Sequence, residues 1–111
     1  RNSNPFSLAL ALRNLAVYYE ISDDIQSTML LLIRVAQIYS EYFEEGHPKV
    51  AQSQSDLAKC YIHAGDIYQA RVLLLQALNT YQNLGGDLHE DTGRIFNNLG
   101  LIAQEEHDYD S

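Results

Sequence analysis

The residues best suited to bind another molecule are amides and cations that lie in three separate stretches of the sequence. The amide side chains of Asn14 and Asn97 can donate and accept hydrogen bonds at the same time. Such groups suit the backbone of an extended peptide better than any one side chain. Arg13, Lys59 and Arg94 add one cation to each stretch. The chemistry that these residue types favour is therefore peptide binding, with no bond made or broken.

A carboxylate is the ligand group that the cations suggest, either a peptide C-terminus or an acidic side chain. Lys59 or Arg94 would hold it together with a neighbouring asparagine. Asp56 argues against this preference, because it places an anion in the middle of the strip. The alternative is that all these side chains are solvated polar residues between packed apolar ones.

The sequence contains no motif of a catalytic site. It has no glycine-rich phosphate loop, no Gly-x-Ser-x-Gly motif and no pair of carboxylates placed where a helix would bury both. Acidic residues stand near His47, but no two histidines are four residues apart, as a zinc site on a helix requires. Cys60, the one cysteine, is expected to be a buried, inert thiol. We predict that the protein is not an enzyme and holds no cofactor and no metal.

The three stretches belong to an internal repeat, which has to be found before the fold can be inferred. Equivalent residues recur at steps of 42, from 15 to 57 to 99. The columns with this spacing are Leu15, Leu57 and Leu99; Ala16, Ala58 and Gly100; and Asp24, Asp66 and Asp108. Several such columns are not expected by chance.

Each repeat contains two stretches in which apolar residues are spaced by three and four, which predicts helices. We expect helices over about residues 5–21, 24–45, 48–64, 67–84 and 90–106. Pro5 and Pro48 suit the first turn of a helix, and Gly65 with Asp66 makes a tight turn between two helices. The predicted organisation is one domain, with repeat 1 at about 5–46, repeat 2 at about 47–88 and a partial repeat 3 at about 89–111.

Repeat 2 resembles the tetratricopeptide repeat. The positions that match the signature of this family are Leu57, Ala58, Tyr61, Ala70, Leu74 and Ala77. The usual period of the family is 34, whereas the 42-residue period and the segment Gly-His-Pro-x-Val-Ala at 46–51 look like the kinesin light chain type. Bacterial peptide-sensing regulators carry similar long repeats. The resemblance implies an all-α, right-handed superhelix of antiparallel helix pairs, with about two and a half repeats.

In that architecture the first helix of each pair lines a concave face, where ligand contacts are expected. The candidate residues at equivalent positions are Leu10, Arg13, Asn14, Val17, Gln52, Ser55, Asp56, Lys59, Arg94, Asn97, Asn98 and Leu101. We expect the protein to bind a peptide or helix of a partner protein there, as an adaptor or scaffold. The alternatives are a regulatory peptide-sensing segment and a structural spacer or self-association unit.

Composition limits the classes of partner and the cellular locations that we expect for the protein. The chain has 111 residues, of which 46% are hydrophobic and 20% charged, and it carries a net charge of −8. These are globular values, and the negative charge disfavours binding to nucleic acid. No apolar run approaches the roughly 20 residues of a membrane span, and a single cysteine suits a reducing compartment. We expect no membrane insertion and a cytoplasmic location, and we interpret the chain as part of a longer array.

Repeat 3 has no second helix to cover its first one. We expect this to leave Ile95, Phe96, Leu99 and Ile102 partly uncovered, although repeat arrays need polar caps for solubility. The sequence therefore predicts that the chain forms a homo-oligomer through this end, by dimerisation or by end-to-end stacking.

Overall fold

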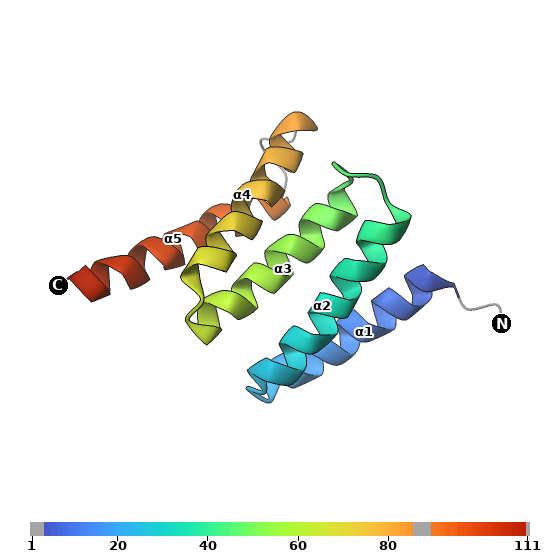
Figure 1. Ribbon diagram of the computed structural model, residues 1–111, viewed down its shortest axis with the longest axis horizontal. Coiled ribbons are helices and arrows are strands. Elements are labelled where there is room, and N and C mark those ends of the chain that lie inside the picture. Colours follow the sequence, from blue (N-terminus) through green and yellow to red (C-terminus); the bar gives the residue numbers. More distant parts are fainter. Residues whose placement is uncertain (1–3, 86–89, 111) are drawn as a thin grey trace.

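The computed structural model describes residues 4–85 and 90–110, which form five α-helices (Figure 1). Their bounds are α1 Pro5–Ile21, α2 Ile25–Tyr42, α3 Pro48–Ala64, α4 Ile67–Asn83 and α5 Glu90–Asp110. The predicted all-α fold is confirmed. The helix starts and ends agree closely with the predicted ranges, except at the end of α2 and at the end of α5, which continues beyond residue 106.

The helices form two antiparallel pairs that follow one another along the molecule, and α5 begins a third (Figure 1). Helix α1 packs on α2, and α3 packs on α4. Helix α2 also contacts α3, while α5 packs against both α3 and α4. This order of contacts is that of a stack of repeats, in which each pair touches only its neighbours.

Local capping explains why the helices begin where they do. Pro5 and Pro48 are the first residues of α1 and α3, where a missing N–H costs nothing. His47 caps α3, because its Nδ1 accepts a hydrogen bond of 3.0 Å from the backbone N–H of Lys49. The Asp24 and Asp66 carboxylates cap α2 and α4, and each accepts from the backbone N–H three residues ahead.

Helix α2 ends at Tyr42, three residues before the predicted end. Phe43 is extended, with φ −116° and ψ 148°, so the backbone leaves the helix there. The Phe43 ring stacks on His47 at a centroid distance of 4.0 Å and on Phe6 at 4.9 Å. These ring contacts hold the α2–α3 connection against the start of α1, which a pattern of helical spacing does not foresee.

Small residues allow the paired helices to approach closely, because the short alanine side chain takes little space between the two backbones. The alanines of the core are at most 2% exposed and are Ala9, Ala16, Ala51, Ala58, Ala70 and Ala77. Leu74 and Tyr81 fill the space between α3 and α4. The core is therefore continuous from the second pair into α5.

The prediction for the C-terminal repeat is only partly right. Ile95 and Ile102 are 0% and 2% exposed, and they pack in one cluster with Leu74 and Ile62. They are buried because this side of α5 faces the preceding helix pair. In the described part of this helix the exposed large apolar residues are Phe96, at 55%, and Leu101, at 38%. The uncovered side of α5 is therefore the side that carries Phe96.

Candidate functional site

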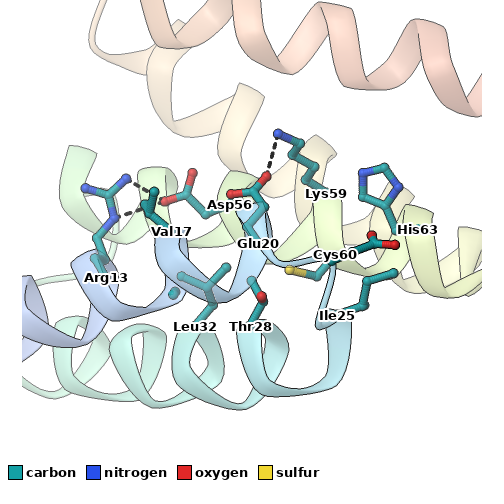
Figure 2. A pocket seen from close by; sticks show the side chains of 12 residues that line it. Arg13, Val17, Glu20, Ile25, Thr28, Leu32, Asp56, Lys59, Cys60 and His63 are labelled. Carbon is teal, nitrogen blue, oxygen red and sulfur yellow. Dashed lines mark hydrogen bonds and ion pairs between the residues drawn. The ribbon is translucent and has the colours of Figure 1, made fainter.

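A cavity of about 170 Å³ opens between α1 and α3, with α2 beneath it (Figure 2). Buried side chains of Leu32, Thr28 and Cys60 form its inner wall together with Ala16. The remaining lining residues are Arg13, Val17, Glu20, Asp23, Ile25, Asp56, Lys59 and His63. The cavity thus has a largely apolar interior and a charged rim.

Two ion pairs cross the rim and join α1 to α3 (Figure 2). Arg13 places Nη2 at 2.8 Å and Nε at 3.2 Å from the same Asp56 oxygen, Oδ2. The Lys59 Nζ lies 2.8 Å from Oε2 of Glu20. Both pairs therefore use long side chains to span the space between the two helices.

The two helices are far apart, which is why such long side chains are needed. No Cα atom of α1 lies within 8 Å of a Cα atom of α3, whereas Cα atoms of α3 and α5 do approach within 8 Å. The ion pairs bridge the wide gap without filling the space below them. The cavity is the volume that remains.

Cys60 lies at the inner wall of the cavity, and the pKa of its thiol is shifted. The pKa of this thiol is raised from 9.0 to about 11, first by burial and then by the nearby Glu20 and Asp56 carboxylates, while Lys59 lowers it by less. The thiolate is the reactive form of cysteine, so this residue is a poor nucleophile near neutral pH. The arrangement suits binding better than covalent chemistry.

Asp23 stands at the α1–α2 turn in a left-handed conformation, with φ 64°. The residue 42 positions later is Gly65, whose φ is 88°. The two turns also have equivalent backbone hydrogen bonds. Asp24 N donates to Tyr19 O, and Asp66 N donates to Tyr61 O, both at 2.9 Å. Asp23 thus occupies a position where glycine is the less strained residue.

The structure brings four of the predicted site residues together at the cavity, namely Arg13, Val17, Asp56 and Lys59. Five others are exposed but do not line the cavity, namely Leu10, Asn14, Arg94, Asn97 and Leu101. Two others are unavailable to a ligand, because Ser55 and Asn98 are each only 8% exposed.

Gln52 has a separate position in the structure. Its side chain is half-buried, and its Oε1 atom is buried with no hydrogen-bond partner among the described atoms. It lines neither this cavity nor the broader polar hollow that lies beside Gln54, Gln76 and Asn79. The predicted strip is therefore split between the cavity, the open surface and the interior.

Several cavity residues were not predicted. They are Ala16, Glu20, Asp23, Ile25, Thr28, Leu32, Cys60 and His63. The signal was present in the repeat columns, where Cys60 stands in place of Ile102 and Glu20 in place of Ile62. Comparing residue sizes within a column, in addition to matching residue types, would have indicated a hollow at the first junction.

In the described ranges, 4–85 and 90–110, no three His, Cys, Asp or Glu side chains gather as ligands for a metal ion. No helix in these ranges is both long and apolar enough to cross a membrane.

Comparisons with known proteins agree with this architecture. A family model described as the tetratricopeptide repeat matches residues 50–111. The crystal structure of BtubC (BKLC) from P. vanneervenii superposes with a TM-score of 0.84 at 24% sequence identity. The match covers 99% of this chain and 43% of that one, so the chain spans less than half the length of BtubC. No curated protein matches the sequence.

Proposed function

Because the chain belongs to the tetratricopeptide repeat family, we propose that it binds a segment of a partner protein on the face formed by α1, α3 and α5. The family is one of protein-interaction modules, and the finer assignment is to this face and to an adaptor or scaffold role. The observation that carries it is the open cavity between α1 and α3, where Arg13, Val17, Asp56 and Lys59 converge. The role is binding without catalysis, and a cytoplasmic location suits the reduced Cys60 thiol.

Two exposed amides, one on α1 and one on α5, support an extended partner segment. Asn14 of α1 and Asn97 of α5 are both exposed, and an amide can bond both the N–H and the C=O of a peptide backbone. Val17 adds an exposed apolar surface at the rim of the cavity. The cavity would then take one side chain, while the amides bind the backbone.

The test is capture of partners by the 111-residue chain and by an Asn14→Ala/Asn97→Ala variant, followed by mass spectrometry. Both positions are exposed, so we expect the variant to keep its circular dichroism spectrum and to lose the partners. A matched Gln37→Ala/Gln82→Ala variant changes two exposed amides of α2 and α4 and should keep them. If both variants retain the same partners, this face is not the binding surface.

Self-association is a second candidate function, favoured by the exposed side of α5. Phe96 is 55% exposed, and Gly93 and Gly100 on the same helix have open space where a side chain would stand. A flat surface of this kind can receive a helix of a second copy. Sedimentation should show a dimer that Phe96→Asp converts to a monomer, and a strictly monomeric chain at high concentration would contradict it.

A further inference from the structure

We propose that the cavity between α1 and α3 holds the side chain of a lysine or arginine from the bound partner segment. This rests on the proposed function, because it names the side chain that the same face selects. The inference follows from the charges of the rim, the shape of the interior and the comparison of the two repeat junctions.

Carboxylates outnumber cations among the lining residues. Glu20, Asp23 and Asp56 face the cavity, against Arg13 and Lys59. Each cation is already 2.8 Å from a carboxylate oxygen, in the Arg13–Asp56 and Lys59–Glu20 pairs. An acidic ligand would have to displace one of these partners. The charge balance therefore disfavours the carboxylate ligand that the cations in the sequence suggested.

A basic side chain meets no such competition. The Asp23 carboxylate forms no ion pair with any side chain that the structure describes, so it can accept a hydrogen bond from a ligand. A carboxylate also has more acceptor positions than one cation occupies. A lysine or arginine head would reach this end of the cavity and add a charge-assisted hydrogen bond.

The interior suits the methylene stem of such a side chain. Ala16, Val17 and Leu32 provide an apolar wall, and long basic side chains bury their stems against apolar surface while their heads stay at a polar edge. A cavity of roughly 150 Å³ is enough to hold a benzene molecule. The observed volume of about 170 Å³ therefore admits an aliphatic chain of a few carbon atoms.

The second repeat junction shows that the hollow is specific to the first. At the equivalent positions, 42 residues on, Cys60 is replaced by Ile102 and Glu20 by Ile62, and both isoleucines are buried. Asp23 is replaced by Gly65. The small Cys60 side chain thus leaves space at the first junction, and the Glu20 and Asp23 carboxylates give this space a negative charge. At the second junction apolar side chains fill the equivalent space.

The test is a titration of the isotope-labelled 111-residue chain, followed by nuclear magnetic resonance of its amides. The probes are n-butylguanidinium and n-butylammonium, which copy the two basic side chains, and pentanoate and 1-butanol, which copy their length without the positive charge. We expect the cations to shift amides of the α1–α2 turn and of α3 saturably, with at least about fivefold higher affinity than pentanoate.

Three variants locate the binding. Asp23→Gly places the residue of the second junction at the turn, and it should reduce affinity for n-butylguanidinium by at least about threefold while the chain stays folded. Cys60→Ile, which copies Ile102, should abolish binding of both cations. Glu41→Gln removes an exposed carboxylate of α2 that does not line the cavity, and it should leave the titration unchanged.

The outcomes separate this inference from the proposed function. Equal or tighter binding of pentanoate or 1-butanol would overturn the preference for a basic side chain, and the absence of saturable shifts with either cation would overturn the site itself. If Cys60→Ile still captures the partners that Asn14→Ala/Asn97→Ala loses, the inference fails while the proposed function stands. If the cations bind but capture does not depend on the face, the proposed function fails instead.

Discussion

The junction between α1 and α3 and the junction between α3 and α5 use the same repeat positions, but only the second is closed. There, Ile62 and Ile102 pack with Leu74, which is fully buried. At the first, Glu20 and Cys60 occupy the positions of the two isoleucines, and a cavity remains. The difference shows that a repeat backbone sets where two helices meet, whereas side-chain volume decides whether they close.

The two junctions also differ in what holds them together. Burial of a leucine or isoleucine side chain contributes about 1.5–3 kcal/mol. Partly exposed ion pairs such as Arg13–Asp56 and Lys59–Glu20 typically contribute about 0–1 kcal/mol. We infer that the closed junction supplies more of the stability of the chain, while the open one leaves room for a ligand.

The largest expected effect is the loss of stability when the equivalent leucine of each junction is truncated to alanine. Leu74→Ala should lower the free energy of unfolding by about 3–5 kcal/mol, because it leaves a cavity in a closed core. Leu32→Ala, at the equivalent position, should cost about 2 kcal/mol, since Leu32 already borders an open cavity. Urea unfolding measures both values, and equal losses would contradict the contrast.

The second effect is alkaline destabilisation through Cys60. The thiol pKa is raised from 9.0 to about 11 in the folded chain, so the unfolded chain releases this proton first as the pH rises. The stability linked to the thiol is complete below pH 9 and is lost as the pH rises towards 11, by on the order of 2 kcal/mol. Unfolding of the chain and of Cys60→Ala at pH 8 and pH 11 should show a smaller loss in the variant, since tyrosine ionisation is common to both.

A smaller effect concerns the turns that end α1 and α3. Asp23→Gly should raise the free energy of unfolding by about 0.5–1 kcal/mol, because Asp23 has φ 64° and glycine adopts this conformation with less strain. Thermal unfolding measures the change, and the reverse substitution Gly65→Asp provides the matched control, which should destabilise. A loss of stability in Asp23→Gly would mean that the carboxylate has a structural role.

The smallest expected effect is that of the Arg13–Asp56 pair. A double-mutant cycle with Arg13→Gln and Asp56→Asn should give a coupling of about 0.5 kcal/mol that decreases with added salt. Urea unfolding at low and high ionic strength measures it. A coupling of several kcal/mol that salt does not change would place this pair among the main determinants of stability.

The fold was largely predictable because its signals are local. The prolines at 5 and 48 predicted two helix starts, and these starts are confirmed. The spacing of Leu57 and Ala58 from their equivalents predicted the repeat. Phe43 shows the limit, because its extended backbone follows from ring contacts with Phe6 and His47 rather than from its own sequence neighbourhood.

The candidate site was only partly predictable. Arg13, Asp56 and Lys59 were expected on one strip as ligand-binding groups, and in the structure they line the cavity while bound in ion pairs. Asn98 occupies the column of Asp56 but is buried. Equivalent repeat positions differ in exposure because α3 and α5 approach more closely than α1 and α3 do.

The sequence by itself determined the helices, the 42-residue register and the family. Capping and apolar spacing act over a few residues, and the repeated columns are visible when segments of the chain are compared. Only the tertiary structure decided that Arg13 and Lys59 pair across the gap and that Asp23, Leu32 and Cys60 surround one cavity. The physical reason is that α1, α2 and α3 each contribute to that cavity. Its size depends on the distance between helices, which the packing of many side chains sets together.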